Sequence, residues 1–209
     1  MTEKEKLLLY YGEMSGPEAG PWNLGVQNKY LEYRITSWFE ENVPVQGTET
    51  ICNIGIGAGY WDRYLSYLVP NGELISIDID EEICEMLRLG LQNENNPNPV
   101  RIICSDVMKV HDLEESCDIV TMVGSSRMES GLYEEILDQA ISFLKPGGIF
   151  YYQTISHEES TEIFTEFCKS KGVKIVQKLK EVKYDINAQY YCVRKQPDFN
   201  RGNDHETAV

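Results

Sequence analysis

Three alternate glycines follow an apolar run in this 209-residue chain, in the order Gly55, Gly57 and Gly59. The run before them, residues 51–54, predicts a buried strand, and the chain after them resumes with helical spacing. Glycines let a backbone turn sharply and let a ligand approach without a Cβ in the way. The pattern predicts a strand, a turn and a helix that together bind an adenosine-like ligand, with an ordinary tight turn as the alternative.

Two acidic residues follow apolar runs, and the first of them is placed to hold the sugar of such a ligand. Asp78 lies nineteen residues beyond Gly59, at the end of a second apolar run, and Asp106 follows a third run. A carboxylate at the carboxyl end of the second strand can accept hydrogen bonds from both ribose hydroxyls. Dinucleotide binding, as in an NAD-dependent oxidoreductase, is disfavoured because Tyr60 stands where the G-x-G-x-x-G pattern requires Gly or Ala.

The ordered set of motifs resembles the class I S-adenosylmethionine-dependent methyltransferases over residues 48–195. The glycine turn resembles motif I of that family, Asp106 resembles the acidic position that receives the adenine amino group, and residues 144–148 resemble the turn into strand five. The resemblance implies S-adenosylmethionine as the cofactor and S-adenosylhomocysteine as the product. The cofactor-binding residues that it implies are Asn53, Gly55, Gly57, Gly59, Asp78, Ile79, Asp106, Val107, Gly124 and, from the N-terminal loop, Tyr11.

One position departs from the family pattern. Members of the family commonly carry Asp or Glu two residues before the first glycine, and this chain has Asn53 there. An amide still forms hydrogen bonds, but it brings no negative charge near the ammonium and sulfonium groups of the ligand. The departure bears on cofactor affinity rather than on cofactor identity.

Candidate catalytic residues follow the fourth and fifth strands, where the acceptor is expected. Arg127 can clamp a carboxylate acceptor bidentately, although the pattern favours a solvated loop residue or an ion pair at a helix start. His157 can act as the general base for a hydroxyl or amine, or it stands unassigned at the start of a helix capped by Ser156 and Glu159. No metal is expected, because the six cysteines are scattered without a C-x-x-C pair.

Alternating strands and helices have to position these residues. We expect strands at 50–54, 73–78, 100–104, 118–123 and about 149–152, and helices at 24–41, 59–69, 80–91 and 157–171. Residues 173–182 and 188–194 lie close in sequence and predict an antiparallel hairpin. The predicted fold is α/β: a seven-stranded doubly wound sheet with the last strand antiparallel. The predicted divisions are an N-terminal helical annex or lid (1–46), the methyltransferase-like domain (47–195) and a polar tail (196–209).

Composition limits the partners of the protein. The net charge is −15, and phosphate backbones attract Lys and Arg, so a nucleic acid is not an expected partner. No apolar run reaches the length of a membrane span, and the first residues do not read as a signal peptide. We expect a cytoplasmic protein without a membrane partner, and the sequence does not indicate its oligomeric state.

The sequence predicts a methyltransferase that acts on a small molecule or a peptide. Oxygen is the expected acceptor atom, with a carboxylate as the acceptor to test first, in the tailoring of secondary metabolites or ribosomally made peptides. Nitrogen methylation is an alternative. A different class of function is a non-catalytic, cofactor-binding regulatory protein, which Asn53 and the lack of a strong acceptor-side signature favour.

Overall fold

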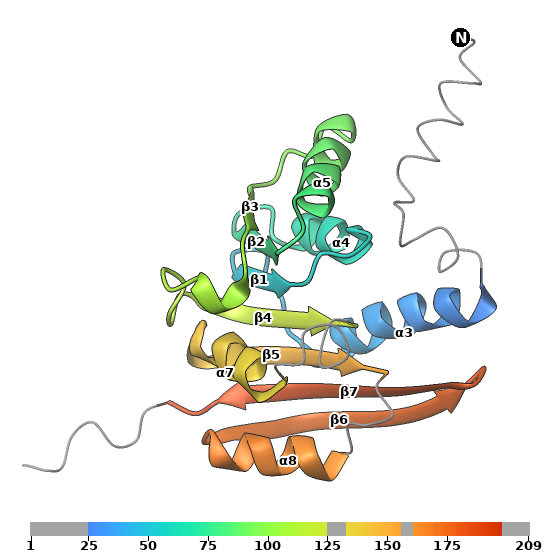
Figure 1. Ribbon diagram of the computed structural model, residues 1–209, viewed down its shortest axis with the longest axis vertical. Coiled ribbons are helices and arrows are strands. Elements are labelled where there is room, and N and C mark those ends of the chain that lie inside the picture. The colour runs from blue at the N-terminus through green and yellow to red at the C-terminus, as the bar shows by residue number, and fades with distance from the viewer. Residues whose placement is uncertain (1–24, 125–132, 156–160, 198–209) are drawn as a thin grey trace, which may run out of the picture.

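The computed structural model describes residues 25–124, 133–155 and 161–197. Helices and strands alternate along these ranges until the C-terminal pair of strands (Figure 1). The helices are α3 (Val26–Asn42), α4 (Tyr60–Leu68), α5 (Glu81–Asn93), the 3-10 helix η1 (Val107–Lys109), α7 (Tyr133–Ser142) and α8 (Thr161–Ser170). The strands are β1 (Thr50–Ile54), β2 (Glu73–Asp78), β3 (Val100–Cys104), β4 (Cys117–Val123), β5 (Leu144–Thr154), β6 (Val173–Lys183) and β7 (Ile186–Lys195).

Seven strands form one sheet in the order β3-β2-β1-β4-β5-β7-β6. The pairings from β3 to β5 are parallel, whereas β7 is antiparallel to both β5 and β6 (Figure 1). The predicted doubly wound sheet with an antiparallel last strand is therefore confirmed. The strand order reverses between β1 and β4, and doubly wound sheets bind ligands beyond the carboxyl ends of their strands at such a point.

The central strands are covered on both faces, which is why they read as continuous apolar runs in the sequence. One face packs against α7 and α8 in a cluster that includes Val120 and Phe164. The other face packs against α3 and α4 in a cluster that includes Ile51 and Leu65. Helix α5 packs against β2 and β3. The sheet is thus held rigidly, and its carboxyl edge is fixed in position.

Aromatic side chains join α3 to the sheet. The ring of Trp38 lies 5.6 Å from that of Tyr151 and 5.7 Å from that of Tyr190, measured between centroids. The Tyr151 hydroxyl donates a hydrogen bond of 2.8 Å to the backbone carbonyl of Ile35. Ile35 and Phe39 are also buried. Helix α3 is therefore part of the main core.

The C-terminal hairpin is tighter than the sequence predicts. Only Tyr184 and Asp185 separate β6 from β7, where a loop over residues 183–187 was expected. Both residues have positive φ, 51° and 64°, which is the combination of a type I′ turn, whose twist matches that of the flanking strands. The sequence pattern missed the turn because Tyr rarely adopts positive φ. Here the ring of Tyr184 packs edge-on against Tyr30 of α3, at 5.6 Å.

The described ranges hold neither a membrane-spanning helix nor a metal-binding cluster of side chains. No helix there is long and apolar enough to cross a membrane. No group of three or more His, Cys, Asp or Glu side chains in the same ranges is arranged to hold a metal ion. The six cysteines are free thiols, and all except Cys104 are buried, so they behave as small apolar side chains in the core.

Candidate cofactor site

The glycine turn joins β1 to α4 at the carboxyl edge of the sheet. All three glycines have left-handed backbone conformations, with φ of 85° at Gly55, 53° at Gly57 and 73° at Gly59. A Cβ on Gly59 would lie 3.3 Å from Leu87 of α5, whereas a Cβ on Gly57 would meet nothing within 4 Å. The turn therefore packs against α5 at its end and faces open space at its middle.

Asn53 ties this turn to the sheet through buried hydrogen bonds. Its Nδ2 donates to the Gly55 carbonyl at 2.9 Å and to both carboxyl oxygens of Asp62 at 3.0 Å. Its Oδ1 accepts from the Thr121 hydroxyl at 2.8 Å, and that hydroxyl in turn accepts from Trp61 Nε1 at 3.2 Å. Strands β1 and β4 and helix α4 are thereby linked behind the turn.

The carboxyl group of Asp62 is fully buried beside Asn53. Burial raises the pKa of Asp62 from 3.8 to about 7, with a smaller upward contribution from the charge of Asp78, while the side chains of Ser76 and Asn53 act in the opposite direction. Asp62 comes from the first turn of α4. A buried carboxyl group contributed by α4 therefore lies next to Asn53.

Asp78 ends β2 with its carboxylate against the glycine turn. One oxygen accepts from the backbone N–H of Ile56 at 2.8 Å, and the other accepts from the N–H of Asp80 at 3.0 Å. Ile56 lies between the first two glycines, so this contact holds the turn beside the end of β2. A carboxylate has about four acceptor positions, and both oxygens therefore retain capacity for ribose hydroxyls.

Asp106 and Val107 follow β3 on the same edge. The backbone N–H of Ser105 donates to the Asp78 carbonyl at 2.8 Å, which places the ends of β2 and β3 side by side. Asp106 caps η1 by accepting from the N–H of Met108 at 3.0 Å, and Val107 is buried. The backbone therefore places Asp106 beside the end of β2, where Asp78 lies.

Ile79 and Gly124 flank the site on either side. Ile79 is 73% exposed although it is large and apolar, as expected of a side chain that a ligand covers. Gly124 follows β4 with φ of 74°, and its N–H donates to the carbonyl of Gln153 at 3.2 Å. The structure therefore brings the predicted cofactor residues that it describes to one edge of the sheet.

Three predicted site residues lie outside the described residues: Tyr11, Arg127 and His157. Their roles stay predictions. The sequence analysis did not assign Asp62 and Thr121, the two partners of Asn53. Asp62 did carry a signal, because it is an acid on the face of α4 that also buries Leu65.

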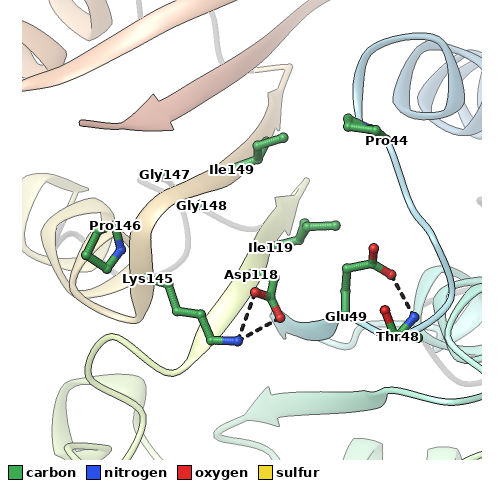
Figure 2. Close-up of a pocket in the computed structure, with 10 residues that line it drawn as sticks. All are labelled: Pro44, Thr48, Glu49, Asp118, Ile119, Lys145, Pro146, Gly147, Gly148 and Ile149. Carbon is green, nitrogen blue, oxygen red and sulfur yellow. Dashed lines mark hydrogen bonds and ion pairs between the residues drawn. The ribbon is translucent and has the colours of Figure 1, made fainter. Parts of the chain in front are cut away.

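A hollow lies at the opposite edge, among the amino ends of β1, β4 and β5 (Figure 2). Lys145 Nζ donates there to the two carboxylate oxygens of Asp118 at 2.8 and 2.9 Å, and the N–H of Thr50 also donates to Asp118, at 2.9 Å. Glu49 accepts from the N–H of Thr48 (Figure 2). The contacts of Asp118 join the amino ends of β1, β4 and β5, and ligands of doubly wound sheets bind at the other edge. The glycine turn is therefore the candidate cofactor site.

Comparison with known proteins agrees with this assignment. A family described as "Methyltransferase domain" matches residues 51–148, which run from β1 to the start of β5. A malonyl-[acyl-carrier protein] O-methyltransferase of Bacillus cereus is 24% identical over 143 residues, which are 68% of this chain and 51% of that protein. The chain spans about half the length of the curated relatives it matches.

Solved structures show the same fold. A putative sarcosine dimethylglycine methyltransferase from Galdieria sulphuraria superposes with a TM-score of 0.70 at 9% identity, covering 90% of this chain and 97% of the other. The [4+2]-cyclase SpnF superposes with a TM-score of 0.68 at 14% identity, covering 78% and 80%. The match to a methyltransferase domain over residues 51–148, which contain the glycine turn and the acidic strand ends, and the shared fold show that this part of the chain is a methyltransferase domain with the class I fold, a domain type whose cofactor is S-adenosylmethionine.

Proposed function

We propose that this protein transfers the methyl group of S-adenosylmethionine to an oxygen atom of a small molecule or a peptide. The observation that carries the proposal is the Asp78 carboxylate, which is bound to the glycine turn through Ile56 and keeps acceptor capacity for ribose hydroxyls. The open space at Gly57 leaves room for the ligand beside that carboxylate. S-adenosylmethionine has no phosphate, so the turn has to accommodate only a nucleoside linked to an amino acid.

The chain's own groups have a positioning task in this reaction. When bound, the cofactor supplies an activated methyl group on a sulfonium, so the protein does not need a nucleophile of its own. In this proposal Asp78 orients the ribose, Asp106 receives the adenine amino group and the glycine turn accommodates the rest of the cofactor. The buried Asn53 network keeps the turn in one conformation, because it links β1, α4 and β4. Alignment of an acceptor in a closed site then provides most of the rate increase.

A carboxylate is the acceptor that we propose to test first. Arg127 would hold it and His157 would serve as the base for other acceptors, with Tyr11 in an N-terminal lid formed within residues 1–46. The similarity to a protein named as a malonyl-[acyl-carrier protein] O-methyltransferase supports an oxygen acceptor. The net charge of −15 supports a partner other than nucleic acid, and we place the reaction in the cytoplasm. Tailoring of natural products or modified peptides is part of this proposal.

Calorimetry and methyl-transfer assays test the proposal together. The protein should bind S-adenosylmethionine and S-adenosylhomocysteine, and with methyl-labelled cofactor it should transfer label to carboxylate-bearing metabolites or peptides in a cell extract. Label in base-stable amide or amine products would favour nitrogen methylation. Binding of both nucleosides without transfer would favour the regulatory alternative, for which Asn53 in place of an acid is the observation. Absence of binding would overturn both functions.

Gly57→Ala should weaken cofactor binding, and its loss of fold stability should be no larger than that of a matched glycine elsewhere in the sheet. An L-residue at φ of 53° costs about 1 kcal/mol, and the added methyl group would enter the open space in which the ligand is expected. Gly147→Ala is the matched control, because Gly147 has φ of 83° and equally open surroundings but lies at the opposite edge of the sheet. Both variants should lose similar stability in denaturant unfolding. Only Gly57→Ala should lose affinity for S-adenosylhomocysteine, by about tenfold or more, and equal affinities would contradict the assignment.

A further inference from the structure

Two polar side chains lie opposite each other at the carboxyl end of β5. Gln153 pairs with Val123 of β4 on one side and with Tyr190 of β7 on the other. Two residues earlier, Thr121 pairs with Tyr151 in the same way. Because side chains alternate between faces, Gln153 and Tyr190 project from the same face as Thr121, one step nearer the carboxyl edge.

Gln153 and Tyr190 lie at the same height along the strands as the candidate cofactor site. Asn53 pairs with both Ser76 and Thr121, and Asp78 lies two residues beyond Ser76 on β2. Asp78 and Gln153 therefore belong to the same row across the sheet, on either side of the point where strand order reverses. Three strand spacings separate them, about 14 Å. A ligand held by Asp78 and one held by Gln153 would approach each other over the ends of β1 and β4.

Both side chains are buried with their polar atoms unpaired. Gln153 and Tyr190 are each 0% exposed, and within the described ranges the Gln153 Oε1 and Nε2 atoms and the Tyr190 hydroxyl have no hydrogen-bond partner. The neighbouring Tyr151 hydroxyl, by contrast, donates to Ile35 at 2.8 Å. Buried polar groups in folded proteins are nearly always paired, and an unpaired one lowers stability unless a ligand or water completes it.

The residues around Gln153 and Tyr190 determine which chemical group of a ligand can bind there. Trp38 packs 5.7 Å from the Tyr190 ring, and Leu179 pairs with Tyr190 on β6. Burial raises the pKa of Tyr190, so its hydroxyl stays protonated and can donate. The nearby cation, Arg34, is paired with Glu181 at 3.5 Å. A charged ligand group would therefore lack a free counter-ion there, whereas a neutral group with one donor and one acceptor would match the Gln153 amide.

We propose that Gln153 and Tyr190 bind an uncharged amide group of the acceptor, which makes a peptide or another amide-bearing molecule the substrate class. This inference rests on the proposed function and extends it, because it places a recognition site beside the reacting atoms rather than on the cofactor. The Gln153 amide pairs with the N–H and C=O of the ligand amide, and the Tyr190 hydroxyl donates to the same carbonyl. The carboxyl edge of the sheet is the nearer one, since only Thr154 of β5 lies beyond Gln153.

The first test compares stability in the absence of ligand. Gln153→Met and Tyr190→Phe remove unpaired groups with little change of shape, so the melting temperature should stay the same or rise. Two matched controls remove paired groups: Gln139→Met, since Gln139 Nε2 donates to the Val110 carbonyl at 2.7 Å, and Tyr151→Phe. Both controls should lower the melting temperature. A comparable decrease in Gln153→Met and Tyr190→Phe would show that these groups are paired within the protein and would overturn the inference.

The second test measures binding of the minimal peptide group. Saturation-transfer NMR with N-methylacetamide, in the presence of S-adenosylhomocysteine, should show binding to the wild-type protein and to Tyr151→Phe. Binding should be about tenfold weaker or lost in Gln153→Met and Tyr190→Phe, and methyl acetate, which lacks the N–H, should bind as weakly to all four proteins. Equal binding of the amide and the ester, or no binding of the amide to a protein that binds S-adenosylhomocysteine, would overturn the inference and leave the proposed function standing. Failure to bind S-adenosylhomocysteine would instead overturn the proposed function.

Discussion

Asp62→Asn should abolish a loss of stability that the wild-type protein undergoes as the pH rises from about 4 to about 7. The pKa of Asp62 in the folded protein is about 7, against an ordinary value of 3.8. Over this interval the folded chain holds a proton that the unfolded chain has released, so the free energy of unfolding decreases with rising pH and is level above the folded-state pKa. The difference between the two pKa values corresponds to at most about 4 kcal/mol.

Denaturant unfolding at a series of pH values measures this effect. The quantity to follow is the unfolding free energy of Asp62→Asn minus that of the wild-type protein, which should increase from pH 4 to pH 7. The side-chain amide introduced by this substitution keeps an oxygen that can accept from Asn53, so the hydrogen bond behind the turn survives in the variant. Parallel curves for the two proteins would show that Asp62 is ionised throughout, and hence that it is better solvated than its burial indicates.

Asp112→Asn is a control of opposite sign. Asp112 accepts a hydrogen bond from Arg101 at the surface, and that contact lowers the pKa of its carboxyl group. The ionised pair stabilises the fold above the ordinary pKa of an aspartate, and the contribution is lost as the pH falls through the lowered value. Relative to the wild type, Asp112→Asn should therefore lose a small amount of stability at neutral pH and none in acid, the reverse of Asp62→Asn.

The sequence predicts the bounds of β1 to β4 to within one residue because these strands are short apolar runs bounded by turn residues, whereas β5, expected at about 149–152, begins earlier, at Leu144. Strands at 50–54, 73–78 and 100–104 have the bounds that the structure shows, since a continuous apolar run bounded by turn residues has few other interpretations. The hairpin loop was predicted too long for the converse reason. Its turn uses Tyr184 and Asp185 at positive φ, and neither residue type signals that conformation as strongly as Asn-Gly would.

The candidate site can be predicted from the sequence where one position requires one residue type. It cannot be predicted where the site depends on a contact between two residues. Glycines with left-handed φ and an acid at the end of β2 are readable one position at a time. The contact between Asn53 and Asp62 cannot be predicted in this way, because it is a hydrogen bond of 3.0 Å between a strand and a helix. Gln153 and Tyr190 are harder still to identify from sequence, because what distinguishes them is that their buried polar atoms have no hydrogen-bond partner among the described residues.

Asp78→Ala should weaken binding of S-adenosylhomocysteine by about 1.5–3 kcal/mol, which is roughly 10- to 150-fold in the dissociation constant. Two losses combine in this variant. The ribose hydroxyls lose a charged acceptor, and the Ile56 N–H loses the 2.8 Å contact that holds the glycine turn beside β2. Calorimetric titration at fixed pH gives the affinity directly. Thermal unfolding of the same samples shows how far the loss of the Ile56 and Asp80 contacts also destabilises the free protein.

Asp80→Ala separates the ligand contact from a general effect of removing an acid from this loop. Asp80 lies two residues from Asp78 and caps α5 by accepting from the N–H groups of Glu82 and Ile83. Its removal should reduce the free energy of unfolding by about 1 kcal/mol and leave the affinity for S-adenosylhomocysteine unchanged. If both variants lose affinity equally, the loop acts through its net charge or its order. If neither does, the ribose is held away from β2, and the glycine turn has to be reassigned to another ligand.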